Sequence, residues 1–278
     1  MRIDAHQHFW HYNPKKHEWI DENMALIRKD FLPQDLSPIL HENNFNGCIA
    51  VQADQTVTET NFLINLAAKN EIIKGVVGWV DFKAENIQER LSHFMQFEII
   101  KGFRHVLQNE DPNFMLESNF LNGIKALKHF NYTYDLLIYP QHLPAAIKLV
   151  KNNPNQLFVI DHIAKPHIKF GLISRWKKNI ELISKYENVF CKISGMVTEV
   201  DYKNWHESDF LPYLDIVVKS FGTKRIMYGS DWPVCLVAAS YREMLNVVEN
   251  YFNGFSETEQ QDFFGKNAQL FYQLNKIT

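Results

Sequence analysis

Two histidines, His6 and His8, follow a short strand-like run at residues 3–6 near the start of the chain. In an extended strand, residues i and i+2 project to the same side, so both imidazoles would point together. Such a pair could polarise a carbonyl group or, with a carboxylate, hold a metal ion. The alternative is two unrelated surface histidines. We favour the functional interpretation, because His-x-His at a strand end has few packing reasons to exist.

A third histidine, His162, ends another strand-like run at residues 157–162. A single histidine at a strand end is often only a hydrogen-bonded polar residue. Its position at a strand end, like the positions of His6 and His8, favours a role in the same site. The neighbouring Asp161 is interpreted as an outward-facing or cap-like residue and is left out of the predicted set.

A carboxylate, Asp231, ends the run at residues 225–231 in the segment Gly229-Ser230-Asp231-Trp232-Pro233. By itself this segment resembles the start of a helix, with Ser230 or Asp231 as N-cap. The last strand of a closed barrel lies beside the first, so Asp231 can reach the two N-terminal histidines. We therefore predict that it is a functional carboxylate.

Weaker signals come from cations and aromatic side chains at other strand ends. Arg104 and His105 end one run and could bind substrate, or they could form an ion pair at the rim. Lys192 and Ser194 end another, and a salt bridge is the simpler account of Lys192. Three tryptophans could stack on the apolar face of a sugar ring, although buried packing explains most tryptophans: Trp10, Trp79 and Trp232. Cys235 has no adjacent base and is not predicted to be a nucleophile.

The elements that must position these residues alternate along the chain. Eight short apolar runs predict strands: 3–6, 47–52, 73–80, 99–104, 134–139, 157–162, 189–194 and 225–231. Segments of helical period lie between and after them: 36–43, 59–69, 86–97, 118–129, 143–151, 174–186, 213–221 and 241–251. Eight strand–helix units predict a (β/α)8 TIM barrel, with residues 1–278 as one domain. The segment 267–272 is predicted to be a helix that packs aromatics onto the barrel.

The segment 9–34 differs from the other connections, because it is long, aromatic and polar. Long loops in compact domains are usually functional or disordered, and its aromatic residues argue against disorder. A loop after the first strand of a barrel lies over the C-terminal face, where barrel active sites are found. We therefore expect it to wall the active site.

Composition excludes several classes of function. The formal net charge of −3 gives no support for nucleic-acid binding. No apolar stretch approaches the ~20 residues of a membrane helix, and no signal peptide is evident. Three cysteines far apart in sequence argue against a disulfide framework and favour a reducing compartment. We expect a cytoplasmic protein; the sequence predicts no oligomeric state.

Several motifs resemble a sugar-lactonase branch of the amidohydrolase superfamily, and they keep their order nearly from end to end. This branch includes L-fuconolactonases and L-rhamnonolactonases, with 2-pyrone-4,6-dicarboxylate lactonase more distant. The motifs are Ile3-Asp4-Ala5-His6-Gln7-His8-Phe9-Trp10, Phe31-Leu32-Pro33, Gly102-Phe103-Arg104-His105, Asp161-His162-Ile163-Ala164-Lys165-Pro166, Cys191-Lys192-Ile193-Ser194-Gly195 and Gly229-Ser230-Asp231-Trp232-Pro233-Val234-Cys235.

The resemblance implies that water opens the lactone ring of a sugar acid at the C-terminal face of the barrel. His6, His8, His162 and Asp231 would form the catalytic quartet, with Asp231 as general base and the histidines as oxyanion donors. Many superfamily members bind divalent metals through such a set, and these four could hold one zinc ion. This chain lacks the lysine and the strand-five histidine of binuclear members, since Leu137-Ile138-Tyr139 ends that run. We expect no obligatory cofactor.

Two alternatives remain open. The superfamily also contains metal-dependent decarboxylases that act on aromatic acids, and product assays distinguish these from lactonases. A sugar-binding barrel without catalysis is the other alternative. The intact quartet argues against it, because binding alone has no need of a general base.

Overall fold

The computed structural model describes residues 1–274, in which eight parallel strands pair in chain order. The strands are β1 (Ile3–Gln7), β2 (Gly47–Val51), β3 (Ile73–Gly78), β4 (Ile100–His105), β5 (Thr133–Leu136), β6 (Phe158–Ile160), β7 (Val189–Ile193) and β8 (Ile226–Tyr228). The last strand returns to the first, because the His8 N–H donates to the Trp232 carbonyl at 2.7 Å. The predicted (β/α)8 barrel is confirmed.

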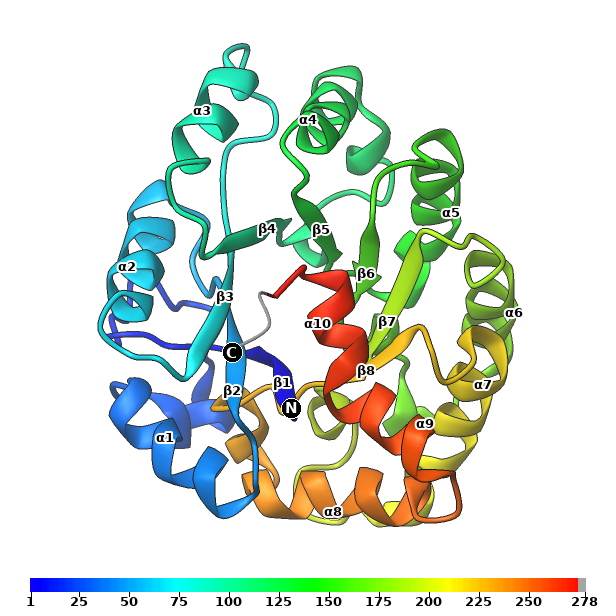
Figure 1. Ribbon diagram of the computed structural model, residues 1–278. Coiled ribbons are helices and arrows are strands. Elements are labelled where there is room, and N and C mark those ends of the chain that lie inside the picture. The colour runs from blue at the N-terminus through cyan, green and yellow to red at the C-terminus, as the bar shows by residue number, and fades with distance from the viewer. Residues whose placement is uncertain (275–278) are drawn as a thin grey trace.

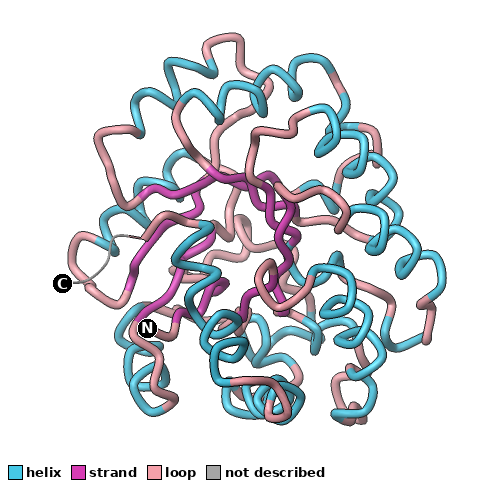
Figure 2. The backbone as a smooth tube through the Cα atoms, turned by 45° about the vertical axis from the view of Figure 1, so that its right-hand side comes forward, coloured by secondary structure: helices cyan, strands magenta, loops and turns pink. Residues whose placement is uncertain are grey.

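Helices surround the strands on the outside of the barrel (Figures 1 and 2). All eight predicted helices are present: α1 (Pro33–Glu42), α2 (Val57–Ala67), α3 (Ile87–Phe94), α4 (Ser118–His129), α5 (Leu143–Asn152), α6 (Ser174–Ile183), α7 (Leu211–Phe221) and α8 (Tyr241–Phe252). Local sequence sets some of their starts. The Ser240 hydroxyl accepts the Glu243 N–H and the Glu243 carboxylate accepts the Ser240 N–H, which is a capping box at α8.

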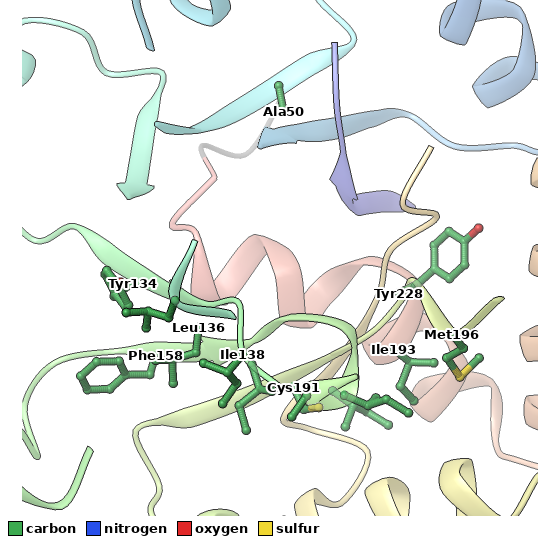
Figure 3. Packing of buried hydrophobic residues seen from close by; sticks show 14 of the residues in the cluster. Ala50, Tyr134, Leu136, Ile138, Phe158, Cys191, Ile193, Met196 and Tyr228 are labelled. Atoms are coloured by element: carbon green, nitrogen blue, oxygen red, sulfur yellow. The ribbon is translucent and has the colours of Figure 1, made fainter. Parts of the chain in front are cut away.

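The apolar core has two layers that follow the alternation of side chains along each strand. In β8, Ile226 and Tyr228 belong to the large cluster between barrel and helices, whereas Met227 belongs to a smaller cluster inside the barrel. Figure 3 shows part of the large cluster, including Leu136 and Phe158 from neighbouring strands. Strands buried on both faces explain the nearly continuous apolar runs in the sequence.

A C-terminal helix covers the end of the barrel where the strands begin. Two short helices, α9 (Glu257–Gln261) and α10 (Asn267–Phe271), follow α8, and α10 lies across the strands in Figure 1. Phe271 and Tyr272 are buried in the inner cluster with residues such as Ile3 and Val51. The prediction that segment 267–272 packs aromatics onto the barrel is confirmed, and α10 acts as a plug at its base.

Six strands end one to three residues earlier than the sequence predicts: β2, β3, β5, β6, β7 and β8. The physical reason is clear for β6 and β8, because His162 (φ 53°) and Asp231 (φ 59°) adopt left-handed backbone conformations that no strand can continue. These two side chains therefore lie on turns just beyond the strands.

Within residues 1–274, the structure contains no helix that is both long and apolar enough to cross a membrane.

Candidate active site

A cavity of about 490 Å³ opens over the C-terminal ends of the strands. Four strand-end residues line it, namely His8, Arg104, His162 and Asp231. Loop 9–34 contributes Lys16, Trp19 and Met24 to the wall. The prediction that this loop walls the pocket is confirmed.

An irregularity in β1 aims its histidines into the barrel. The pairing of β1 with β2 shifts register between Asp4 and Gln7. Before the shift, Ile3 and Ala5 face the inner cluster; after it, the buried His6 ring lies among groups at the barrel mouth. A β-bulge re-aims side chains in this way, and without it the strand alternation would turn His6 outward.

The structure brings the four residues of the predicted quartet together. One carboxylate oxygen, Asp231 Oδ1, lies 3.4 Å from His8 Nε2 and 3.9 Å from both His6 Nε2 and His162 Nε2. The two N-terminal histidines face each other, with their Nε2 atoms 3.2 Å apart. All four residues are at most 5% exposed, so their mutual electrostatics are weakly screened.

Hydrogen bonds assign the ring nitrogens of His8. Its Nδ1 lies 2.8 Å from the Val51 carbonyl oxygen, which can only accept, so Nδ1 carries the proton. A neutral His8 therefore presents an unprotonated Nε2 to the cavity. It cannot act as the neutral oxyanion donor that the sequence analysis assigned to it.

Burial sets the charge state of the remaining groups. Desolvation lowers the pKa values of His6 and His162 well below the usual histidine value, although nearby carboxylates oppose this. Desolvation raises the pKa of Asp231, but His162 and His8 outweigh it and hold that pKa below its usual value. Near neutral pH the site therefore combines neutral imidazoles at His6 and His162 with an ionised Asp231.

Asp161 is a residue of the site that the sequence analysis left out. It is not outward-facing or cap-like but fully buried, with Oδ1 3.2 Å from His6 Nδ1 and Oδ2 accepting a 3.0 Å hydrogen bond from Arg104 Nη1. Two cations that point inward at strand ends, Arg104 and Lys192, were the available signal. Buried charges need partners, and Asp161 is a carboxylate at the end of a predicted strand, so it was available as the partner of these two cations.

A column of buried charges runs from Asp161 towards the base of the barrel. Lys192 Nζ lies 3.0 Å from Asp161 Oδ1 and donates to Asp135, which also accepts a 2.8 Å hydrogen bond from the Tyr272 hydroxyl. The salt-bridge interpretation of Lys192 is confirmed. Burial raises the pKa of Asp135 to about 6, although Lys192 opposes the rise. Lys192, Arg104 and His6 together outweigh burial at Asp161, so its pKa is well below the usual value.

The turn after β6 carries His162 in an unusual backbone conformation. Four successive residues, His162 to Lys165, have φ between 46° and 61°, and none is glycine. The left-handed region costs such residues roughly 1–2 kcal/mol each, and most for a β-branched residue such as Ile163. Gly195 packs against this turn, since a Cβ there would lie 2.4 Å from His162 Nδ1. The Ser194 hydroxyl is 2.9 Å from the same nitrogen.

Of the predicted substrate-binding residues, only Arg104 lines the cavity. The ring of His105 instead lies between Glu110 (3.1 Å) and the Trp79 indole N–H (3.3 Å). Trp10 and Trp232 are both 1% exposed and pack edge-on against Phe31. The tryptophan available for stacking is Trp19, whose place within a loop gave no strand-end signal.

The donor set fits one divalent metal ion. His6, His8 and Asp231 each offer one ligand atom in a compact group. Their separations of 3.2–3.9 Å bracket the ~3.3 Å expected between ligands that lie ~2.0 Å from a tetrahedral metal. The unprotonated Nε2 of His8 is the form that binds metal. A second group, His6 with Asp161 and His162, is less suitable because Lys192 and Arg104 already neutralise Asp161.

Comparisons with known proteins support these observations. A family model described as amidohydrolase matches residues 3–274. The chain is 35% identical to an L-fucono-1,5-lactonase from Burkholderia multivorans, over 99% of this chain and 96% of that protein. It is 32% identical to an L-fucono-1,5-lactonase from Burkholderia ambifaria, over 99% and 97%. A crystal structure of an amidohydrolase from Burkholderia multivorans with bound zinc superposes with a TM-score of 0.96 at 35% identity, covering 99% and 100%.

Proposed function

This chain belongs to the amidohydrolase family, and on that premise we propose that it hydrolyses the lactone ring of a sugar acid, with Asp231 as the general base. The observation that carries the proposal is the convergence of Asp231 with three imidazoles at the mouth of the cavity. The full-length relatives with lactonase names support the same reaction class.

In the proposed mechanism, ionised Asp231 takes a proton from a water molecule as its oxygen attacks the lactone carbonyl carbon. The carbonyl becomes a tetrahedral oxyanion. When it collapses, the bond to the ring oxygen breaks, and Asp231 returns the proton to this oxygen. Water is thereby consumed, and the products are a carboxylate, a hydroxyl and one released proton.

Hydrogen-bond donors at the cavity stabilise the oxyanion. We assign this role to His162 in the tautomer in which the Ser194 hydroxyl, 2.9 Å away, donates to Nδ1 and the ring proton lies on Nε2. Arg104 has a buried Nε–H without a partner in the described structure and is the second candidate donor. The ring of His6 lies beside Asp161, with its Nδ1 3.2 Å from Asp161 Oδ1.

A neutral, hydroxyl-rich substrate suits the charges around the cavity. Two of the cations that line it are already paired, the buried Arg104 with Asp161 (3.0 Å) and the partly exposed Lys165 with Glu199 (2.7 Å). Side chains such as Gln55, Asn109 and Tyr202 line the wall and can hydrogen bond to sugar hydroxyls. The full-length relatives with lactonase names also favour this reaction over the decarboxylase alternative.

Where a divalent metal is bound, His6, His8 and Asp231 would hold it, and it would supply Lewis-acid polarisation of the carbonyl and acidify water. We keep the prediction that turnover does not require it, because lactones are activated esters. Zinc is the metal that the donor set suits best.

The proposed function is tested by screening neutral sugar lactones, including L-fucono-1,5-lactone, with a pH indicator. We expect proton release and no CO2 release from a parallel set of aromatic acids. Chelator-treated enzyme should keep most of its activity. Release of CO2 without lactone hydrolysis would establish the decarboxylase alternative, and tight binding of lactones without turnover would establish a sugar-binding barrel. Loss of activity on chelation, restored by zinc, would replace the metal-independent mechanism.

A further inference from the structure

The left-handed turn at residues 162–165 holds two side chains of the cavity wall in place. His162 and Lys165 both line the cavity, while Ile163 and Ala164 between them are fully buried. If this segment relaxed to an ordinary right-handed or extended conformation, both side chains would leave the wall together. Something must therefore hold the backbone in a conformation that non-glycine residues rarely adopt.

One side chain outside the catalytic face contacts this backbone directly. The indole N–H of Trp176 donates a 2.7 Å hydrogen bond to the carbonyl oxygen of Ile163, in the middle of the turn. Trp176 lies in the first turn of α6, is 1% exposed, and packs against Tyr213 of α7 with ring centroids 5.3 Å apart. The donor is therefore fixed by the helix layer rather than by the cavity.

Most other restraints on the turn act at its ends. The Lys165 N–H bonds to the His162 carbonyl at 2.7 Å, and the Lys165 ammonium pairs with Glu199 at the rim. The His162 ring contacts the Ser194 hydroxyl. In the middle of the turn, the Ile163 backbone also bonds to the Cys191 thiol of β7, and the bond from Trp176 is the one that ties this point to the helix layer.

We propose that Trp176 is a positioning residue, whose hydrogen bond to the Ile163 carbonyl keeps the left-handed turn in the form that presents His162 and Lys165 to the cavity. This inference rests on the proposed lactone hydrolysis for its kinetic readout. It assigns a role to a residue that touches neither substrate nor reacting atoms. Trp176 is 13 positions from Ile163 in the sequence, and it acts on the site only through the Ile163 carbonyl.

The test compares Trp176→Phe with Trp205→Phe. Phenylalanine keeps an aromatic ring but removes the N–H. Trp205 is a matched control, because its indole N–H also donates to a backbone carbonyl, that of Ala238, at 2.9 Å. We expect kcat/KM of Trp176→Phe to fall on the order of 10- to 100-fold, with lower kcat and higher KM, because His162 and Lys165 shift together. Trp205→Phe should stay within threefold of the wild type.

Rescue separates positioning from general stability. Ala164 sits in the turn at φ 61°, a conformation that glycine adopts freely. In the Trp176→Phe background, Ala164→Gly should restore at least half of the decrease in log(kcat/KM). The reason is that glycine adopts the left-handed conformation without strain, so the turn depends less on the Trp176 hydrogen bond. A loss that this substitution does not relieve would overturn the proposal. If Trp176→Phe fails to fold, an active double variant supports the proposal and an unfolded one overturns it.

Hydrogen–deuterium exchange provides a readout that needs no substrate. Amides of residues 161–165 should exchange faster in Trp176→Phe than in the wild type, and unchanged exchange there would overturn the proposal. If the wild type hydrolyses no sugar lactone, the proposed function fails, but the exchange comparison still decides the role of Trp176.

Discussion

At the residue scale, the chemistry depends on one carboxylate surrounded by imidazoles. Asp231→Asn keeps the shape of the side chain but cannot accept the proton of water. We expect kcat to fall by at least ~100-fold, the lower end of general-base contributions, with the fold intact by circular dichroism. Near-native turnover in this variant would remove Asp231 from the mechanism.

Asp30→Asn is the matched control for that experiment. Asp30 also pairs with an imidazole, that of His11 at 2.6 Å, but both side chains are more than half exposed in loop 9–34. Its turnover should equal that of the wild type, since exposed ion pairs contribute little and this one lies outside the cavity.

The sequence predicts the quartet but not its support. His6, His8, His162 and Asp231 end strand-like runs, and strand ends of a parallel barrel meet at one face. Asp161 was not included in the predicted site, because its partners come from β4 and β7 and only the folded barrel brings them within 3.0 Å. The predicted tryptophans, in contrast, were included but do not line the cavity. A position after a strand does not tell whether a large ring faces the cavity or packs against other apolar side chains.

At the element scale, α2 carries a buried acid whose titration opposes folding at high pH. Glu59, in the first turn of α2, accepts the Ala53 N–H at 3.2 Å, and burial raises its pKa from 4.5 to about 7. The folded state thus keeps a proton that the unfolded chain releases. This contribution to stability is fully present below pH ~4.5 and is lost as pH rises through 7. Its size is at most about 3 kcal/mol.

Urea denaturation at pH 5 and pH 8 measures this effect against that of the buried His6 and His162, whose lowered pKa values cost the folded state stability as pH falls. Asp4, whose pKa burial raises to about 6, acts in the same direction as Glu59. The free energy of unfolding at pH 8 minus that at pH 5 should be more positive in Glu59→Gln than in the wild type, since an amide accepts the same hydrogen bond and does not titrate. Glu42→Gln, at an exposed position of α1, should leave it unchanged. An identical pH dependence in wild type and Glu59→Gln would contradict this account.

Element types were more predictable than element ends. The periods of 2 and 3.6 residues report burial, which the barrel imposes on every strand and helix. The ends of β6 and β8 depend instead on left-handed residues, and nothing in the identities of His162 or Asp231 requires that conformation. The register shift in β1 is likewise set by pairing with β2.

At the scale of the whole molecule, the base of the barrel depends on the plug formed by α10. Phe271 is 1% exposed and packs against Phe190 of β7 with ring centroids 4.9 Å apart. Phe271→Ala should lower the free energy of unfolding by about 3–5 kcal/mol. The neighbouring Leu270 is 69% exposed, so Leu270→Ala should change it by less than about 0.5 kcal/mol. Equal effects in denaturant titrations would refute the plug.

The plug also bears on the order in which the protein is made. A ribosome releases Ile3 and Ala5 well before part of their final covering, Phe271 and Tyr272, is synthesised. Translation from the end of β1 at position 7 to the start of α10 at position 267 adds 260 residues and takes roughly 13–50 s. For that interval the inner face of β1 lacks its native neighbours at the base. A nascent chain halted before α10 would therefore expose apolar side chains of β1 that α10 covers in the complete barrel.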